Sequence, residues 1–180
     1  MPETTLTIVP LSPELLADVN RSNQPFTVFG RLVPTFDGSS WSWTEEFFAE
    51  PYQKQYPAET LDYGQYIDNP DKAMFLAYRN HTCVGQIRLS RNWNGFCLVE
   101  DIAVGRDYRA QGVGSRLLEI GSQWARAGGM GGLMLETQDI NLAACRFYQH
   151  HGFLLGGVDK LLYHLGSSRG EVALFWYKTW

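Results

Sequence analysis

The sequence predicts a single mixed α/β domain whose central sheet is mostly antiparallel and flanked by helices. Two observations predict this class. In the middle of the chain, apolar segments of strand length follow one another through short turns. After them the pattern changes to strand, helix, strand and helix, and two more strands end the chain. Strands joined by short turns form antiparallel meanders, and helices between strands cover the faces of a sheet.

The N-terminal part of the chain carries the weakest signals. Residues 6–11 are predicted to form a strand, and residues 12–14, Ser-Pro-Glu, to start a short helix because proline fits the first helical position. Between residues 23 and 70, five prolines interrupt the candidate elements, and only residues 44–48 look helical, with Thr44 as the cap. We expect this aromatic-rich region to form a variable wall of a binding site.

From residue 73 onward the periodicity is clear. Turn signals at residues 79–82 and 92–95 separate three predicted antiparallel strands. Leu117, Ile120 and Trp124 recur at helical spacing before a pair of glycines that ends the helix. The predicted elements are strands 73–78, 83–89 and 96–104, helix 115–127, strand 133–137, helix 142–151, and strands 158–163 and 172–177.

Composition and charge exclude several classes of protein. The 180 residues are enough for one domain with a sizeable core and hardly enough for two. An apolar fraction of 44% excludes a disordered chain. The formal charge of -4 argues against a nucleic-acid partner, which usually meets a basic face, and it suits a cationic ligand.

The cysteine and histidine patterns predict neither disulfides nor a metal site. The three cysteines are odd in number without short spacing, and the four histidines lack the spacing of metal ligands. Residues 1–11 contain two prolines and no Lys or Arg, unlike a signal peptide, and no apolar run approaches the roughly 20 residues that span a bilayer. We therefore expect a cytoplasmic protein without a membrane segment.

A glycine-bearing loop between a predicted strand and a predicted helix is the most informative stretch. Residues 109–114 read Arg-Ala-Gln-Gly-Val-Gly. Glycines allow a tight turn and close approach of a ligand, and the amides at a helix N-terminus favour an anion such as pyrophosphate. The loop lacks the Lys-Ser/Thr of a P-loop and the glycine order of a dinucleotide fingerprint. A Gly-x-Gly loop alone also fits an ordinary turn.

The order of the elements together with this loop resembles the GNAT superfamily of acetyl-CoA-dependent N-acetyltransferases. The family signature, Gln/Arg-x-x-Gly-x-Gly/Ala after a strand with an apolar end, matches residues 109–114 after Ile-Ala-Val at 102–104. A second signature matches from Asn141 to Tyr148 and then Gly152-Phe153. The resemblance implies the GNAT fold, with acetyl-CoA as co-substrate and no metal.

The resemblance also implies which residues hold the coenzyme. Backbone amides from Gln111 to Ser115 would bind its pyrophosphate, the edge of residues 102–104 would pair with the pantetheine arm, and the Asn141 amide would bind that arm. Asn141 also fits a helix cap, and both roles can hold at once. The cofactor-binding residues implied are Ile102, Ala103, Val104, Arg109, Ala110, Gln111, Gly112, Val113, Gly114, Ser115, Asn141 and Tyr148.

Four blocks of the C-terminal half look more narrowly like streptothricin acetyltransferases, which inactivate nourseothricin-type antibiotics. They are residues 97–104, 133–141, 158–163 and 173–177. This resemblance implies acetylation of an amine in the β-lysine part of the antibiotic, hence resistance. Residues 73–180 would form the acetyl-CoA-binding core of the single domain 1–180, with residues 1–72 on the acceptor side. GNAT proteins often pair, so a homodimer stays open.

Acetyl transfer needs a neutral amine, so the reaction calls for a base, and the departing thiolate calls for an acid. Glu136 ends a strand five residues before Asn141, a spacing that resembles GNAT members with a glutamate as general base acting through water. Tyr148 matches the family tyrosine that protonates the departing thiolate; a phenol with an ordinary pKa near 10 is protonated at neutral pH.

Three more carboxylates are predicted to bind the acceptor, namely Glu100, Asp101 and Asp139. Glu100 and Asp101 are adjacent, so on a regular strand they face opposite sides, and only one can point at the acceptor unless a bulge re-aims the other. We interpret one of the pair as an anchor for cationic groups. For each of these acids, and for Glu136, the alternative is a solvated charge at the end of a strand.

Two other functions fit the same residues. The first is a GNAT enzyme that acts on an aminoglycoside, a polyamine or a protein N-terminal amine. The second is a module that binds an acyl-CoA without chemistry. Tyr148 and the nearby carboxylates argue against the second, because a module that only binds needs no proton donor there.

Overall fold

The computed structural model describes residues 5–180, so the first four residues of the predicted domain and of the N-terminal segment lie outside it. The chain divides into two compact units, each built from two separate stretches. The first unit comprises residues 5–25 and 55–133, and the second comprises residues 26–54 and 134–180. The single domain and its division at residue 72 stay predictions.

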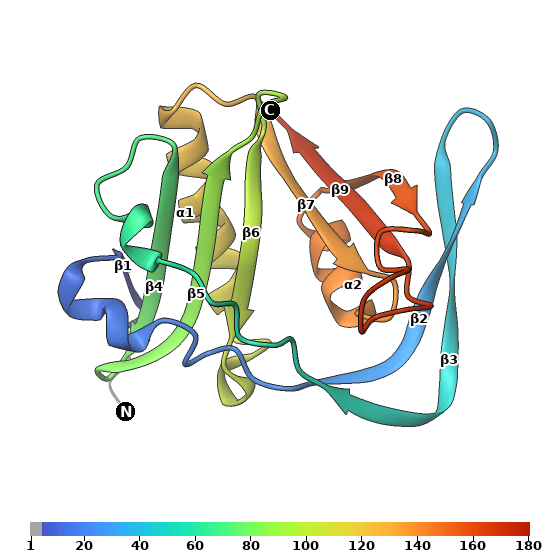
Figure 1. The fold of residues 1–180 in the computed structure, drawn as a ribbon, viewed down its shortest axis with the longest axis horizontal. Coiled ribbons are helices and arrows are strands. Elements are labelled where there is room, and N and C mark those ends of the chain that lie inside the picture. The colour runs from blue at the N-terminus through green and yellow to red at the C-terminus, as the bar shows by residue number, and fades with distance from the viewer. Residues whose placement is uncertain (1–4) are drawn as a thin grey trace. The chain divides into compact units, whose positions relative to one another are not determined.

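Four strands form the sheet of the first unit (Figure 1). Their order is β1 (Thr7–Pro10), β4 (Lys72–Arg79), β5 (Thr82–Arg91) and β6 (Cys97–Val104), and each neighbouring pair is antiparallel. The predicted meander is confirmed within a few residues. Asn80 and His81 join β4 to β5 with φ angles of 48° and 64°, which is the left-handed pair that a two-residue hairpin turn requires.

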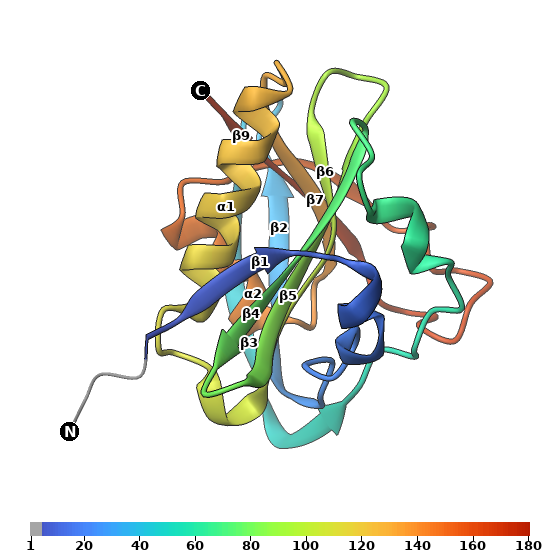
Figure 2. The ribbon, with the colours of Figure 1, turned by 90° about the vertical axis from the view of Figure 1, so that its left-hand side faces the viewer.

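The helix α1 (Val113–Ala127) covers one face of this sheet, as Figure 2 shows. Glycines let it approach β5 closely. A Cβ atom added at Gly85 would lie 3.0 Å from side-chain atoms of Leu117 and Val113, and one at Gly121 would lie 3.1 Å from Ile87. From Gly85 onward, the odd-numbered residues of β5 therefore face α1, and the even-numbered ones face the other side.

Two short 3-10 helices belong to the opposite side of the same unit (Figure 2). They are η1 (Pro13–Asp18), which starts where the Ser-Pro-Glu motif predicts a helix, and η2 (Tyr63–Tyr66). Tyr66 packs in a buried cluster with Leu11, Met74 and Leu76, so both segments are anchored to the sheet by apolar contacts.

The second unit contains the strand–helix–strand pattern predicted for the C-terminal part. Its elements are β7 (Gly132–Gln138), α2 (Leu142–His150), β8 (Leu154–Asp159) and β9 (Ala173–Thr179). β9 lies between β7 and β8, and it pairs with β8 in antiparallel fashion. Trp176 and Phe153 are almost fully buried in its core. The predicted class, a mostly antiparallel sheet with helices, is confirmed.

The first strand of the predicted last pair begins and ends earlier than the sequence indicates, and the second agrees within two residues. β8 ends at Asp159, whose side-chain Oδ1 accepts hydrogen bonds from the amides of Leu161 (2.7 Å) and Leu162 (3.0 Å). This turn bends the chain out of the sheet, and both leucines are exposed. The apolar residues after Asp159 had extended the predicted strand to residue 163.

The helix predicted at residues 44–48 is wrong, because this stretch lies in a long hairpin of the second unit. The hairpin pairs β2 (Phe26–Phe36) with β3 (Trp41–Lys54). From residue 41 to 46, partly buried and exposed residues alternate, which is the period of a strand. Pro51 is tolerated because the register shifts there, between the pairs Val28–Tyr52 and Gly30–Phe47.

Arg146 ties the hairpin to α2. Its guanidinium donates two hydrogen bonds to the carboxylate of Glu45, at 2.8 and 2.5 Å. It also lies 5.4 and 5.8 Å from the ring centroids of Phe29 and Phe47. The hydrogen bond from Arg146 keeps the pKa of Glu45 below its ordinary value.

Replacing Gly85 by Ala should destabilise the protein by about 1–3 kcal/mol, because the new methyl group meets α1 and the carbonyl oxygen of Ala103 at 3.2 Å. Chemical denaturation measures this free energy of unfolding. Gly131→Ala is the matched control, because nothing lies within 4 Å of a Cβ atom there. We expect its effect to stay within about 1 kcal/mol. Equal effects of the two changes would contradict the close helix packing.

Candidate active site

The loop predicted to bind pyrophosphate connects β6 to α1 through η3 (Arg106–Tyr108). Ala110 and Gly112 adopt the left-handed conformation, with φ angles of 58° and 81°. For Ala110 this conformation costs roughly 1–2 kcal/mol, so its surroundings must impose it. The chain then enters α1 at Val113, where the first amides of a helix have no partner within the helix and favour an anion.

Two side chains of this loop hold its shape. The guanidinium of Arg109 donates to the backbone carbonyls of Val104 (2.9 Å), Pro25 (3.0 Å) and Gln24 (3.2 Å). The side chain of Gln111 accepts a hydrogen bond from Arg79 at 2.6 Å and donates to the carbonyl of Asp107 at 2.7 Å. The motif side chains thus brace the loop, and its backbone stays the element that can meet a ligand.

Residues 102–104, predicted to pair with pantetheine, form the end of β6. Within the first unit they pair with residues 85–87 of β5. β6 is the last strand of that unit's own sheet order. Ile102, Ala103 and Val104 are all partly exposed.

A β-bulge at Glu100 brings the two neighbouring acids to the same face. Arg88 pairs with Asp101 and Leu89 pairs with Val99, so Glu100 is the extra residue of β6. The Tyr66 hydroxyl donates to Glu100 at 2.5 Å, and the Glu100 carboxylate lies 3.2 Å from Nε of Arg88.

Asp101 is bound by a neutral partner. Its Oδ2 accepts a hydrogen bond of 2.6 Å from Nε2 of Gln86. Gln86 and Arg88 are both even-numbered residues of β5, so both acids lie on the face opposite α1. The bulge that the adjacent acids required is present.

Carboxylates outnumber the cations around Arg88. The buried Arg88, which is 5% exposed, also binds Glu59 at 2.5 Å, so three carboxylates surround one guanidinium. Burial raises the pKa of Asp101, and the hydrogen bond from Gln86 opposes that rise. Burial and the bond to Glu100 raise the pKa of Tyr66, which therefore stays protonated as a donor.

Sequence reasoning missed Gln86, Arg88, Tyr66 and Glu59. A signal was available for the first two, because Gln86, Arg88 and Ser90 place polar side chains at every second position of an otherwise apolar strand. Glu59 and Tyr66 lie outside the sheet and reach this face through a proline-rich stretch. Nothing in the local sequence pattern indicates that contact.

In the second unit, Glu136 is the one exposed residue of β7, whose other residues are buried. Although solvent reaches its side chain, the surrounding protein displaces part of the water around the carboxyl group and raises the pKa of Glu136 to about 7. A carboxyl group with this pKa exchanges protons readily at neutral pH.

Asp139 is buried and binds the protein backbone. It is 2% exposed, and its Oδ1 accepts a hydrogen bond of 2.9 Å from the amide of Val172. Its own amide donates to the carbonyl of Val172 at 2.9 Å. Burial raises its pKa, against the effect of this bond. Its carboxylate is committed to the backbone, so we leave Asp139 out of the proposed acceptor site.

Asn141 and Tyr148 lie at the start and near the end of α2. The Asn141 side-chain oxygen accepts a hydrogen bond from the amide of Ala144 at 3.2 Å, so the predicted cap is present. Pantetheine binding would use the amide nitrogen of that side chain, and the two roles are compatible. Tyr148 is 7% exposed, with ring centroids of Phe147 and Phe153 at 5.5 and 5.6 Å.

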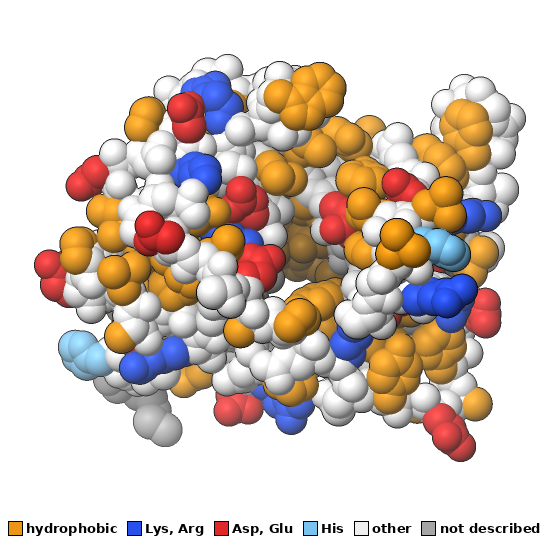
Figure 3. All heavy atoms as spheres, viewed as in Figure 1, with side chains coloured by type: hydrophobic (Ala, Val, Ile, Leu, Met, Phe, Trp, Pro, Cys, Tyr) orange, Lys and Arg blue, Asp and Glu red, His pale blue; other side chains and the backbone are white. Residues whose placement is uncertain are grey.

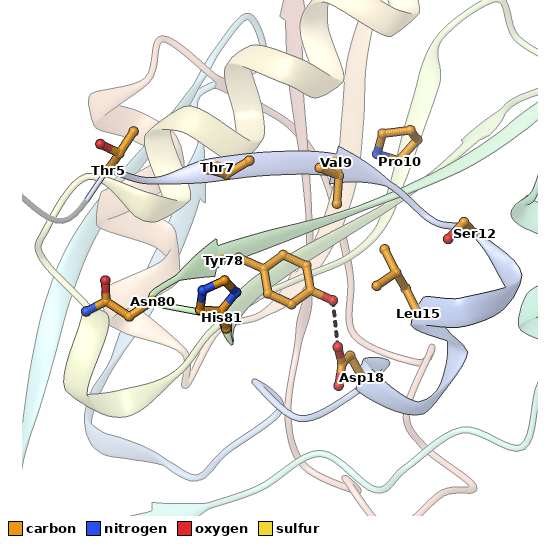
Figure 4. A pocket seen from close by; sticks show the side chains of 10 residues that line it. All are labelled: Thr5, Thr7, Val9, Pro10, Ser12, Leu15, Asp18, Tyr78, Asn80 and His81. Carbon is orange, nitrogen blue, oxygen red and sulfur yellow. Dashed lines mark hydrogen bonds between the residues drawn. The ribbon is translucent and has the colours of Figure 1, made fainter.

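An open groove of about 1000 Å³ also lies in the first unit, between β1, η1 and the turn after β4 (Figure 4). Tyr78 crosses it and donates a hydrogen bond of 2.7 Å to Asp18. None of the residues predicted to bind coenzyme or acceptor lines this groove.

The visible surface mixes the two signs of charge. In Figure 3, Lys and Arg side chains are separated by acidic, apolar and uncharged ones on the face that is shown. Within residues 5–180, no group of three or more His, Cys, Asp or Glu side chains is arranged to hold a metal ion. None of the helices in this part of the chain has the length and apolar character to cross a membrane.

Comparison with known proteins identifies the family. The model of the acetyltransferase (GNAT) family matches residues 39–153. This range includes the glycine-bearing loop 109–114, Glu100, Asp101 and Tyr148. This chain is a GNAT acetyltransferase. It is 48% identical over 162 residues to streptothricin acetyltransferase A of Bacillus subtilis (strain 168), covering 90% of this chain and 93% of the relative.

Two solved structures resemble this GNAT enzyme over nearly its whole length. One, from Bacillus anthracis str. Ames, is assigned as a streptothricin acetyltransferase and was solved in complex with acetyl coenzyme A; it has a TM-score of 0.91 and 37% identity, covering 98% of this chain and all of its own. The other is a nourseothricin acetyltransferase, with a TM-score of 0.83 and 29% identity, covering 97% of this chain and 98% of its own.

Replacing Glu136 by Gln should stabilise this GNAT enzyme increasingly as the pH rises from 5 to 8. The pKa of this carboxyl group rises from 4.5 in the unfolded state to about 7 in the folded state. At low pH the group is protonated in both states, and at higher pH its ionisation favours the unfolded state and destabilises the wild-type protein. The measurement is the difference in Tm between variant and wild type across this range. Glu50→Gln, at an exposed position of β3, is the control. A difference that falls with pH would contradict the raised pKa.

Proposed function

We propose that this chain transfers the acetyl group of acetyl-CoA to an amine of streptothricin or a closely similar cationic antibiotic, at its β-lysine part, and thereby gives resistance. The observation that carries the proposal is the acidic face formed by the bulge in β6, directly before the coenzyme loop. The 48% identity to a streptothricin acetyltransferase supports the same acceptor.

Acetyl-CoA would be held mainly by backbone groups in this proposal. The amides from Gln111 to Ser115 lie at the end of α1 that favours a diphosphate. Arg109 and Gln111 brace the loop with their side chains. Residues 102–104 would pair with the pantetheine arm as an added strand does, and Asn141 would donate to it from its amide nitrogen.

The acceptor would be bound on the face of β5 and β6 that lies opposite α1. Glu100 and Asp101 lie there, and carboxylates bind ammonium groups through charge-assisted hydrogen bonds that are roughly twice as strong as neutral ones. Segment 1–72 contributes Glu59, Tyr63 and Tyr66 to this face. This supports the assignment of residues 1–72 to the acceptor side and of residues 73–180 to the coenzyme.

The attacking amine must lose a proton before it can react. A lysine-type amine with a pKa of about 10.4 is roughly 3.4 units above pH 7, so deprotonation costs about 4.6 kcal/mol. Glu136, with its pKa of about 7, is the proposed general base, acting through water. At pH 7 and above it is increasingly ionised and able to accept the proton.

Tyr148 is the proposed donor to the departing CoA thiolate. A phenol is a weaker acid than a thiol with a pKa of about 8.5, so this transfer is uphill by about 2 kcal/mol in water. The burial of Tyr148 fits a site where a free thiolate is poorly solvated, which reduces that cost.

An amine panel tests the acceptor. Purified protein is incubated with acetyl-CoA and, separately, streptothricin, an aminoglycoside, a polyamine and a peptide with a free N-terminus. Mass spectrometry should detect a monoacetylated product of streptothricin with turnover well above that of the other amines, and NMR of the product should place the acetyl group on the β-lysine part. If only the peptide or only the polyamine were acetylated, that compound and not streptothricin would be the acceptor. Absence of every product together with calorimetric binding of acetyl-CoA would indicate the non-catalytic module.

Removing the hydroxyl of Tyr148 should slow the reaction without weakening coenzyme binding. We expect Tyr148→Phe to lower kcat by about 100-fold or more, which is the usual contribution of a general acid. The dissociation constant for CoA, measured by calorimetry, should stay within about threefold because the ring and its packing remain. Phe147→Leu is a control for disturbed packing around Tyr148. Weakened CoA binding at unchanged kcat would contradict the donor role.

A further inference from the structure

We propose that Asp101, rather than its neighbour Glu100, is the carboxylate that receives a cationic group of the acceptor, and that Gln86 is the positioning residue that keeps Asp101 ready for it. This inference rests on the proposed function, and it names which of two adjacent acids recognises the cation and what holds that acid.

Gln86 lies at the centre of a hydrogen-bond chain within the first unit. The residue is 1% exposed. Its Oε1 accepts a hydrogen bond of 2.7 Å from the backbone amide of Asn20, and its Nε2 donates to Oδ1 of Asn20 at 3.0 Å and to Asp101 at 2.6 Å. Both the oxygen and the nitrogen of this buried amide therefore have hydrogen-bond partners.

The backbone amide of Asn20 decides how the Gln86 side chain is oriented. A backbone N–H can only donate, so the atom of Gln86 that it meets must be the carbonyl oxygen. The amide nitrogen must then point at Asp101, whose Oδ2 must accept. An ionised carboxylate can accept this hydrogen bond. A proton on Oδ2 would instead place two donors against each other.

The orientation is reinforced beyond Asn20. Because Oδ1 of Asn20 accepts from Gln86, its Nδ2 is the donor to the hydroxyl of Tyr63, at 2.8 Å. That hydroxyl donates to the carbonyl of Glu59 at 3.3 Å. Asn20 holds a left-handed φ of 66°, a conformation that asparagine tolerates better than most residues. From Gln86 the donors therefore run through Asn20 and Tyr63 to the Glu59 carbonyl, and Gln86 donates on its other side to Asp101.

Glu100 differs from Asp101 because its charge already has strong partners. Arg88 lies 3.2 Å from it, and Tyr66 donates to it at 2.5 Å. Moving Glu100 to an external cation would take one of two carboxylates from the buried Arg88 and leave the Tyr66 hydroxyl without its acceptor, which is costly. Asp101 accepts its hydrogen bond from the neutral amide of Gln86, and a cation is the partner that its charge lacks.

Three charged groups from the surrounding elements act on Asp101 at longer range. They are Arg88 of β5, Glu100 of β6 and Glu59 before η2. The arginine favours the ionised form, and the two glutamates oppose it. Burial raises the pKa of Asp101 most strongly, and the Gln86 hydrogen bond is the largest effect in the opposite direction. Without Gln86, therefore, the carboxyl group should take up a proton at higher pH.

The test is Gln86→Leu, studied in the full chain. The titration of Asp101, followed by carboxyl carbon NMR and assigned with Asp101→Asn, should move upward by about one pH unit. The KM for the amine should rise while calorimetric CoA binding changes less than twofold. A residue with a merely structural role would lower Tm without moving the Asp101 midpoint.

Two further variants separate the roles. Gln138→Leu, which removes another buried glutamine, one bonded to Ser168 at 3.1 Å, should leave the Asp101 titration in place. Asn20→Gly keeps the backbone amide that orients Gln86, so it should move the midpoint upward by less than Gln86→Leu does. It also serves as the test if Gln86→Leu fails to fold. An Asp101 midpoint that does not move in a folded variant of either kind overturns the role of Gln86.

Asp101→Asn should lower kcat/KM for the amine by about 100-fold, and by more than Glu100→Gln does. The reverse order overturns the assignment of the cation to Asp101. Failure of the proposed function would give a different result. The wild-type protein would then acetylate no cationic antibiotic, while the Asp101 titration would still shift in Gln86→Leu.

Discussion

One extra residue in β6 determines the character of the site. The bulge at Glu100 turns two neighbouring carboxylates toward the same face of a sheet, where a regular strand would have separated them. Two acids side by side in a half-buried position repel each other and lose hydration. The fold compensates by placing Arg88 and Tyr66 on one of them and Gln86 on the other. Much of what lies on this face of the first unit follows from that need.

The loop proposed to bind the coenzyme is built differently, because side chains set its shape and the proposed binding surface is backbone. Arg109 belongs to the motif that identified the family, and its guanidinium reaches three carbonyl groups of the protein itself. A lysine could not reproduce this geometry, because its ammonium group lacks the fixed fork of a guanidinium. The motif thus describes how a loop with a strained Ala110 is held in the shape that the proposed anion site requires.

Features encoded by neighbouring residues could be predicted from the sequence. The meander, both helices and the glycine loop depend on periods of two or 3.6 residues and on local turn chemistry, so their positions were found within a few residues. The hairpin formed by β2 and β3 was missed because its stability comes from pairing across the hairpin and from Arg146, 101 residues away from Glu45. The contacts of Gln86 with Asn20 span 66 residues, and no local pattern announces them.

The two proposed acids, Asp101 and Glu136, suit different tasks because their surroundings differ. Glu136 has lost hydration without gaining a partner that favours its charge, and its pKa of about 7 suits proton transfer. Asp101 is held by Gln86 as an acceptor, which suits attraction of a cation. These tasks conflict if they fall on one nitrogen, since a carboxylate that binds an ammonium group opposes its deprotonation. An acceptor with several amines would remove the conflict, because the cationic group that Asp101 is proposed to attract and the nitrogen that loses its proton would then be different ones. The two proposed roles therefore favour an acceptor with several amines over a molecule with a single amine.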